Sequence, residues 1–487
     1  MIIKSNSTID FTYDKSILGI TNGGGGGHGM AMDSAHHQYT TQKNISEDAI
    51  HKLIKIDVIK GSFPPLINNV VHKLFTKGWN DAKRKGDINK QEYFIKGKAL
   101  KKGPTNQRLA DIFLFIPVFV ATFFRLAFNR KITRIVDTQP LATGALIKAA
   151  RLVNFLFRRN ISVTKIMTDL PTTEAIHFSV PIKRLSKKDK KIFELVTTNP
   201  LIEKADAGLS EKEWWHKYFN LNLNLENPEK SEVKYRPFPL RPAFATWKNR
   251  PLKGSHPHIQ VKINNSEEQE CINDLLKMHL KKKTVNYGSD NKKKNVIHVP
   301  IKDEDFVGMI TIGSQAAEGT QDYLEQFVDI IKDKVKTDDE NTNYFLFVQS
   351  GKHEPNMQNS LFKNVYKKAK NAIIPEKLRN RINIIPMGFQ DDDEFAPLFH
   401  RANFGIYSTG GLTTMEVNTI ANGNIMLHSE KKLSAEDENK SLEELQTILL
   451  DGFSIWEKGN ARYQQVKKGA KIVSPKIFKK TMESLGK

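Results

Sequence analysis

The sequence predicts an α/β protein with two doubly wound domains, each built on a parallel sheet. Two stretches alternate short apolar strands with helices, one over residues 132–169 and one over residues 306–428. This alternation is typical of parallel sheets, whose ligands collect where the strands end. A chain of 487 residues is also too long for one hydrophobic core, so two or three domains are expected.

The composition describes a globular protein with a strong positive charge. Hydrophobic residues make up 39% of the chain and the formal net charge is +21, which indicates an anionic partner such as nucleic acid, an acidic membrane surface or a phosphorylated substrate. Cys271 is the single cysteine, so a disulfide framework is excluded and a reducing compartment is favoured. No signal peptide is expected, because charged residues interrupt the start of the chain. We expect a cytoplasmic protein, with a peripheral membrane position or secretion as a bacterial effector as open alternatives.

The first domain begins with a strand and a glycine run. Ser16–Thr21 is apolar and leads into Asn22–Gly29, which contains five consecutive glycines. Such a run is commonly a flexible linker, but between a strand and the helix expected from Met30 it would bring backbone amides against a phosphate or a sugar. His28 closes this loop, as a solvated histidine or as a general base.

The apolar stretch Ile112–Phe128 is the one membrane candidate in the sequence. It has about 17 residues, contains Pro117 and carries Arg125, so it is marginal for a membrane span. A buried helix is expected, or an interfacial one with Arg125, Arg130 and Lys131 at the lipid headgroups.

The segments after this apolar stretch have the order strand, helix, strand. Ile132–Asp137 and Ser162–Asp169 are strand candidates on either side of a helix over Ala145–Phe157. Asp137 and Asp169 both stand at strand ends, where each could face a ligand or cap a helix.

Residues 181–300 differ in character, because they carry lysine clusters, two adjacent tryptophans and a proline-rich run. We interpret them as a basic accessory region and linker. Solvated charge is favoured over a specific nucleic-acid site.

The second domain resumes the strand–helix rhythm and contains the most informative loop, Tyr407–Glu416. Gly410 and Gly411 allow a sharp turn into a helix whose first amides suit a diphosphate. Glu416, one turn further, could accept hydrogen bonds from a ribose diol. The alternative is an ordinary strand-to-helix turn. Asp391–Asp393 are interpreted as charges at a helix N-terminus rather than as a metal-binding DxD motif.

Five segments in order carry a family resemblance. GSQAA at 313–317, QSGK at 349–352, GFQDD at 388–392 and TGGLTTME at 409–416 resemble the C-terminal domain of MurG-type N-acetylglucosaminyltransferases, which belong to glycosyltransferase family 28. GGGGGH at 23–28 is similar to the glycine-rich loop that ends in histidine in that family. The resemblance implies the GT-B fold, two Rossmann-like doubly wound domains facing a cleft, here with a large insertion.

The resemblance also implies site residues. His28, which ends the glycine-rich loop of Gly25, Gly26 and Gly27, is the expected base. Asp169 is the second catalytic candidate because it stands at a strand end, not because of the resemblance. Glu416 would bind the ribose and the Phe389–Gln390 backbone would face the base. The donor-binding residues that it implies are Ser314, Gln315, Phe389, Gln390, Ser408, Thr409, Gly410, Gly411, Leu412, Thr413 and Glu416.

The expected function is therefore transfer of a sugar from a nucleotide-diphosphate sugar to a lipid or protein acceptor. UDP is favoured over GDP, and the reaction would be inverting, with no metal and no further cofactor.

The expected domains are 1–180 for the acceptor, 181–300 as the accessory region, 301–455 for the nucleotide-sugar, and a helical tail, 456–487, that packs back on the first domain. The alternatives are a sugar-nucleotide epimerase of the same fold and a non-catalytic basic protein that binds nucleic acid or membranes. The segment after Gly423 departs from the family and leaves the donor sugar open.

Overall fold

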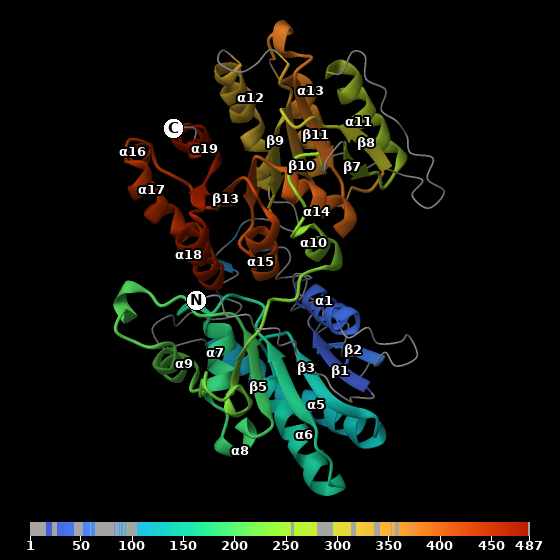
Figure 1. Ribbon diagram of the computed structural model, residues 1–487, viewed down its shortest axis with the longest axis vertical. Coiled ribbons are helices and arrows are strands. Elements are labelled where there is room, and N and C mark those ends of the chain that lie inside the picture. Colours follow the sequence, from blue (N-terminus) through green and yellow to red (C-terminus); the bar gives the residue numbers. More distant parts are fainter. Residues whose placement is uncertain are drawn as a thin grey trace. The chain divides into compact units, whose positions relative to one another are not determined.

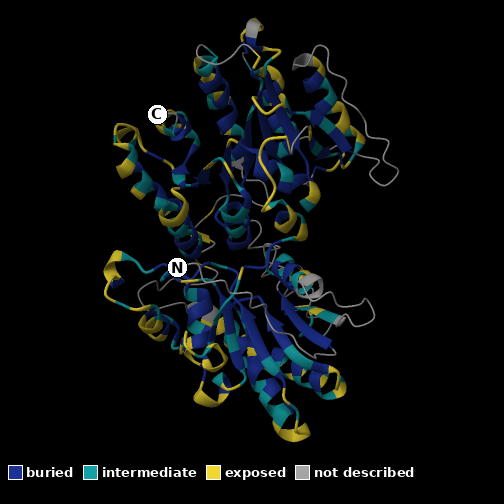
Figure 2. Ribbon diagram, viewed as in Figure 1, coloured by how far each residue is buried: buried dark blue, intermediate teal, exposed yellow. Residues whose placement is uncertain are grey.

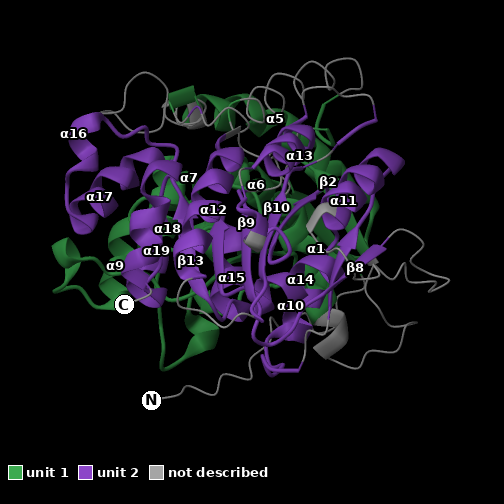
Figure 3. Ribbon diagram, turned by 90° about the horizontal axis from the view of Figure 1, so that it is seen from above, with its two compact units in different colours: residues 1–82, 89–242, 454–463 green, residues 83–88, 243–453, 464–487 purple. Residues whose placement is uncertain are grey.

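The computed structural model describes most of the chain as two compact units. The described residues are 16–21, 27–42, 52–58, 60–63, 82, 87, 89–90, 93, 105–254, 258–279, 296–312, 318–335, 341–351, 353–355, 360–372 and 374–485. Unit 1 comprises residues 1–82, 89–242 and 454–463, and unit 2 comprises residues 83–88, 243–453 and 464–487 (Figure 3).

Unit 1 contains, within its described residues, a six-stranded parallel sheet of order β2-β1-β3-β4-β5-β6. Its strands are β1 (Ser16–Thr21), β2 (Lys52–Asp57), β3 (Ile132–Asp137), β4 (Ser162–Ile166), β5 (Phe193–Thr197) and β6 (Val233–Tyr235) (Figure 1). The chain runs from β1 outward to β2 and then returns to the other side of β1 with β3, so the winding direction reverses between β1 and β3.

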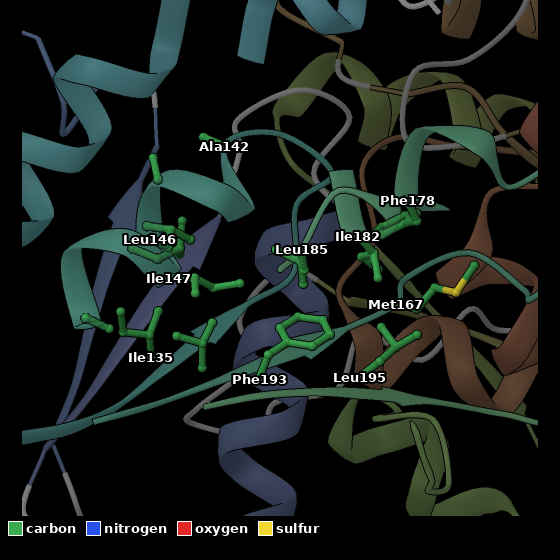
Figure 4. Close-up of a cluster of buried hydrophobic side chains, with 14 of the residues drawn as sticks. Ile135, Ala142, Leu146, Ile147, Met167, Phe178, Ile182, Leu185, Phe193 and Leu195 are labelled. Atoms are coloured by element: carbon green, nitrogen blue, oxygen red, sulfur yellow. The ribbon is translucent and has the colours of Figure 1, made fainter. Parts of the chain in front are cut away.

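The described residues of unit 1 also form helices, and all of these except the four-residue α8 bury apolar side chains. They are α1 (Gly27–Gln42), α5 (Thr105–Phe128), α6 (Thr143–Phe157), α7 (Ile176–Lys183), α8 (Lys187–Lys190) and α9 (Glu211–Phe219). In α6 the buried residues Leu146, Ala149, Ala150 and Val153 recur at helical spacing. Ile135, Leu146 and Phe193 belong to the resulting core, which joins strands to helices (Figure 4).

Unit 2 repeats the plan. Its described residues contain a six-stranded parallel sheet of order β11-β10-β9-β12-β13-β14, and the winding reverses between β9 and β12. The strands are β9 (Phe306–Thr311), β10 (Tyr344–Gln349), β11 (Ile382–Met387), β12 (Phe404–Tyr407), β13 (Asn424–His428) and β14 (Lys471–Val473). A separate antiparallel pair consists of β7 (His258–Lys262) and β8 (Val296–Pro300). The helices are α10 (Pro242–Trp247), α11 (Ser266–His279), α12 (Tyr323–Lys334), α13 (Leu361–Asn371), α14 (Asp392–Arg401), α15 (Gly411–Ile420), α16 (Ala435–Glu438), α17 (Leu442–Leu449), α18 (Ile455–Lys468) and α19 (Phe478–Leu485).

The predicted fold class is confirmed for each unit by itself, because both are doubly wound and Rossmann-like. The expected accessory region at 181–300 is not a separate body, however. Residues up to 242 belong to unit 1, where β5 and β6 extend its sheet, and the remainder belongs to unit 2. The lysine clusters concealed this in the sequence, since β6 has only three residues, Val233–Tyr235, one of them a lysine.

The tail also divides between the units. Residues 454–463, which include the first half of α18, belong to unit 1, and residues 464–487 belong to unit 2. The tail was expected to be helical, but it also contains β14, which pairs with β13 at the edge of the sheet. Three residues at a sheet edge give too short an apolar run to distinguish from a helix turn.

Candidate functional site

The topology marks one position in each unit where ligands are expected. In doubly wound sheets, ligands bind beyond the carboxyl ends of the strands at the point where the strand order reverses. In unit 1 that point lies between β1 and β3, and in unit 2 between β9 and β12. The predicted His28 follows β1, and the predicted Tyr407–Glu416 loop follows β12.

His28 is held by the backbone at the reversal point of unit 1. It lies in the first turn of α1, and its Nδ1 is 2.7 Å from the carbonyl oxygen of Thr138, the residue after β3. The hydroxyl of Thr138 in turn donates to the His28 carbonyl at 2.9 Å. Because a carbonyl only accepts, Nδ1 carries the proton and Nε2 carries the lone pair in the neutral ring.

The protonation of His28 is set by opposing effects. Burial lowers the pKa of His28, while the negative charge of Asp169 and the hydrogen bond to Thr138 raise it. The net shift is downward, so the neutral tautomer with a basic Nε2 is the form present at neutral pH. This is the state that a general base needs.

Asp169 follows β4 and has both carboxylate oxygens engaged. Oδ2 is 2.8 Å from His177 Nε2, and Oδ1 accepts from the Asn460 side chain at 2.9 Å. Burial raises the pKa of Asp169, but the hydrogen bonds from His177 and Asn460 outweigh it, and the net pKa is lowered. Asp169 is therefore an ionised carboxylate that acts on His28 through its charge.

The segment 454–463 completes this cluster from a distant part of the chain. Besides binding Asp169, Asn460 accepts a hydrogen bond from the Leu170 backbone at 2.9 Å. Gly459 packs against Thr172 so closely that a Cβ on it would lie 2.2 Å from the threonine hydroxyl. The loop that carries Asp169 is thus fixed by residues about 290 positions later in the sequence.

Asp137 has a structural position. It is fully buried and its Oδ2 lies 2.7 Å from Nζ of Lys165, which is fully buried as well. Thr143 and the Gln139 backbone donate the other hydrogen bonds to the Asp137 carboxylate. The sequence left open whether Asp137 faces a ligand or caps a helix. Both of its carboxylate oxygens are bonded within the turn into α6, whose N-cap is Ala142, so Asp137 supports this turn and does not cap the helix.

The loop after β12 forms the helix start that the sequence predicts. Gly410 is the N-cap of α15 with an extended backbone, and no side chain among the described residues caps this helix. The first amide to bond within the helix is that of Thr414, to the carbonyl of Gly410, so the amides of Gly411, Leu412 and Thr413 precede the helical ladder. A Cβ added to Gly410 would meet nothing within 4 Å, so this position tolerates a methyl group.

The other predicted donor residues vary in accessibility. Ser408 and Thr413 are partly buried, whereas Thr409 and Glu416 are buried; Glu416 lies in the second turn of α15 with none of its surface exposed. The backbone amide of Ser408 donates to the Thr311 carbonyl at 3.1 Å, which ties the loop to the end of β9. The loop is therefore anchored at the reversal point of the sheet.

Phe389 and Gln390 contact the antiparallel pair. The side chain of Gln390 accepts from the Lys262 amide at 2.7 Å and donates to the Lys262 carbonyl at 2.9 Å, while Asn264 donates to the Phe389 carbonyl. The Gln390 side chain is thus occupied, and the Phe389 ring, 40% exposed, is the accessible group of this turn. Asp391 is the N-cap of α14, and acidic residues fill the first turn of that helix, as the helix-terminus interpretation predicts.

Four predicted residues, Ser314, Gln315, Gly25 and Gly26, lie outside the described part of the chain, and Gly27 is the first residue of α1. Within the described residues, no group of three or more His, Cys, Asp or Glu side chains is arranged to hold a metal ion.

The sequence reasoning missed the residues that support His28 and Asp169. Thr138 follows the predicted strand end and could have been found there, whereas His177 and Asn460 gave no local signal.

The two Rossmann-like units define the fold class of this protein. Comparisons with known proteins do not assign it to a narrower family. No protein-family model matches the chain, and no curated protein sequence matches it. Among solved structures it is similar to MurG of Acinetobacter baumannii, with 12% identity over 97% of this chain and 90% of that chain and a TM-score of 0.44. It is also similar to a UDP-forming α,α-trehalose-phosphate synthase of Burkholderia vietnamiensis (9% identity, 96% and 90% covered, TM-score 0.39) and to UDP-GlcNAc 2-epimerase of Methanocaldococcus jannaschii (13% identity, 97% and 99% covered, TM-score 0.33). Since these TM-scores are below 0.5, function is inferred from the residues of this chain.

Proposed function

We propose that this protein is a glycosyltransferase that moves a sugar from a nucleotide-diphosphate sugar to an acceptor hydroxyl. The observation that carries the proposal is His28, held at the reversal point of unit 1 with Nδ1 bonded to a backbone carbonyl and Nε2 left basic. The start of α15, which no side chain of the described residues caps, lies at the reversal point of unit 2 and supplies the second requirement, a place for a diphosphate.

The chemistry follows from these two groups. His28 Nε2 takes the proton of the acceptor hydroxyl as its oxygen bonds to the anomeric carbon of the sugar. The bond from that carbon to the diphosphate breaks, and the leaving diphosphate carries the bonding electrons. Amides of Gly411, Leu412 and Thr413 stabilise its charge, as the positive end of a helix dipole does. One displacement inverts the anomeric centre, and a metal ion is not required.

Membership of the MurG-type family is part of this proposal, and the sequence motifs support it. The donor is a UDP-sugar rather than a GDP-sugar, held by the loop over 408–413 with Glu416 toward the ribose and Phe389 beside the base. Ser314 and Gln315 are further donor-binding residues of unit 2 in this proposal, and Gly25–Gly27 precede His28 in the glycine-rich loop of unit 1. The acceptor is a lipid or a protein, and the net charge of +21 suits an anionic membrane surface as a further partner.

The first test is nucleotide binding by thermal shift with UDP, GDP and their sugars. A nucleotide at 100 times its dissociation constant should stabilise the protein by about 2.7 kcal/mol. The variant Gly410→Ala should fold normally, because its backbone is extended and the added methyl meets open space. It adds a methyl group to the loop that we propose holds the diphosphate, so it should weaken UDP binding. Gly144→Ala, in the first turn of α6 with equally open surroundings, is the matched control.

Transfer itself is tested by incubating a labelled UDP-sugar with lysate and separating lipids from proteins. His28→Ala should keep nucleotide binding and lose transfer, whereas His37→Ala, on the same helix, should keep both. No stabilisation by any nucleotide, or full transfer by His28→Ala, contradicts the proposal. Conversion of the donor sugar to its epimer without transfer would instead identify the epimerase alternative, and salt-dependent nucleic-acid binding without any nucleotide effect would identify the non-catalytic one.

A further inference from the structure

The ring of His28 is held from the ends of two neighbouring strands of unit 1. Its Nδ1 lies 2.7 Å from the carbonyl oxygen of Thr138, after β3, and 3.1 Å from the hydroxyl oxygen of Thr168, after β4. β3 and β4 pair directly, and Figure 2 shows the strands of this sheet mostly in the buried colour. The proposed reaction assigns no part to Thr168, which immediately precedes Asp169 in the sequence.

The hydrogen atoms of this contact can be assigned from hydrogen-bonding capacity. The Thr138 carbonyl can only accept, so Nδ1 of His28 donates to it. The Thr168 hydroxyl can both donate and accept, and its oxygen lies 3.5 Å from the same carbonyl. When the hydroxyl hydrogen points to that carbonyl, an oxygen lone pair faces Nδ1–H. The Nδ1 hydrogen is then shared between two oxygens that belong to different strand ends.

Both oxygens that hold the ring are neutral. The carboxylate oxygens of Asp169 accept hydrogen bonds from other side chains, and Asp169 acts on His28 through its charge. Asp169 therefore affects how strongly His28 binds a proton. Thr138 and Thr168 affect where the ring points.

The chain around Thr168 is fixed on both sides. The amide of Met167 donates to the Val196 carbonyl of β5 at 3.0 Å. Two residues after Thr168, the Leu170 amide donates to the Asn460 side chain at 2.9 Å. Thr168 itself is 6% exposed, and a β-branched side chain has few χ1 rotamers. Its hydroxyl is therefore a preorganised contact for the ring and not a mobile surface group.

A second contact at Nδ1 has a geometric consequence. The terminal torsion of a histidine side chain is broad, so one hydrogen bond leaves the imidazole free to tilt about the line between donor and acceptor. An oxygen on another strand restricts this tilt and thereby the position of Nε2. Misplacement of a reacting group by about 1 Å can cost about 100-fold in rate.

We propose that Thr168 is a positioning residue, whose hydroxyl and the Thr138 carbonyl together fix the His28 ring so that Nε2 meets the acceptor hydroxyl. This inference rests on the proposed glycosyl transfer. When Nε2 takes the proton of the acceptor, the ring becomes positive, and both oxygens stabilise it through the hydrogen bond of Nδ1–H. Thr168 gains and loses no proton in this step.

An NMR titration of the full chain with ¹⁵N-labelled histidine tests the contact without a substrate. The His28 signals are those that disappear in His28→Ala. Thr168→Val keeps the shape of threonine and leaves the charges that act on His28, those of Asp169, His177 and Lys165, in place. The pKa of His28 should fall by about 0.5 to 1, because the positive ring loses an acceptor. Thr168→Ser keeps the hydroxyl and should titrate like the wild type.

Kinetics test the consequence for transfer from a labelled UDP-sugar to the lysate acceptor. Thr168→Val should lower kcat about tenfold and change the KM for the UDP-sugar less than about twofold, because the contact orients the base and not the donor. Thr168→Ser should restore most of kcat. The matched control is Thr197→Val, in which a buried threonine at the end of β5 loses its hydroxyl. It should titrate and react like the wild type.

Three outcomes would overturn the inference. Thr168→Val with the titration and kcat of the wild type would show that the hydroxyl holds nothing. Equal losses in Thr168→Ser and Thr168→Val would assign Thr168 to packing alone, and equal losses in Thr197→Val would remove the specificity of the position. Wild-type protein that neither binds a nucleotide nor transfers sugar refutes the proposed function, and the role of Thr168 in transfer with it. The titration then still decides whether Thr168 holds the ring.

Discussion

Replacing Lys165 tests how unit 1 holds the strand ends beside His28. Lys165 and Asp137 are both fully buried, with Nζ and Oδ2 2.7 Å apart. Nζ also donates to the Gln139 carbonyl at 2.6 Å and to the Thr143 hydroxyl at 2.7 Å. The ammonium therefore satisfies three buried acceptors, and the substitution Lys165→Met removes all three contacts while keeping most of the apolar volume.

The expected loss follows from the charge that remains. Breaking a buried ion pair by removing one partner costs about 3–5 kcal/mol, since the other charge stays desolvated. The double variant Lys165→Met with Asp137→Asn removes that charge, so it should recover about 1–3 kcal/mol relative to Lys165→Met alone. Lys55→Met is the control in the same unit: Lys55 pairs with Asp33 at 2.5 Å, but both side chains are substantially exposed, and the loss should be about 0–1 kcal/mol.

Urea unfolding followed by tryptophan fluorescence measures these differences in unit 1, because Trp214 and Trp215 are fully buried in its core. A loss below about 1 kcal/mol for Lys165→Met would refute the reasoning. So would a double variant that is less stable than Lys165→Met alone, because the pair would then not be coupled.

Three further predictions concern single positions. Asp169→Asn should lower the pKa of His28 further, since the Asp169 charge raises it; an NMR titration of the His28 ring checks this, and an unchanged or higher pKa would contradict it. Gly308→Ala in β9 should cost unit 2 about 1–3 kcal/mol in urea unfolding, because the new Cβ would lie 2.2 Å from an aromatic ring of β12. Gln390→Ala should speed amide exchange at Lys262, whose N–H loses its acceptor; equal protection in both proteins would mean that another group holds β7.

The sequence was sufficient to predict much of both sheets. Ser16–Thr21 and Ile132–Asp137 were predicted with the bounds that the structure has, and Phe306–Ile312 exceeds β9 by one residue. Such strands are buried on both faces in a parallel sheet and therefore form continuous apolar runs that are easy to detect. The edge strands β6 and β14 are short and partly polar, and neither was predicted. β2 and β5 of unit 1 were also missed, and each of them contains charged residues.

The candidate site was predictable only where one local segment contains it. His28 and the loop over 407–416 each combine glycines with a strand before and a helix after, so their position in the fold could be inferred from neighbours in sequence. Asn460 and Asp169 are 291 residues apart, and their hydrogen bond depends on how α18 returns to unit 1. No periodicity or motif in one sequence pairs such residues, because the contact is created by the tertiary fold.

That distant contact bears on the strength of the proposed base. Burial alone would keep His28 neutral but would also make Nε2 a weak acceptor of a proton, and the nearby negative charge of Asp169 opposes this effect. Asp169 exerts it only while ionised, and its pKa is lowered because the hydrogen bond and charge of His177, together with the hydrogen bond from Asn460, outweigh its own burial. A base should be neutral at the working pH and still basic enough to take a proton. We infer that residues 454–463 contribute to this balance from the far end of the chain, so weakening their packing should lower the basicity of His28 without any change next to it.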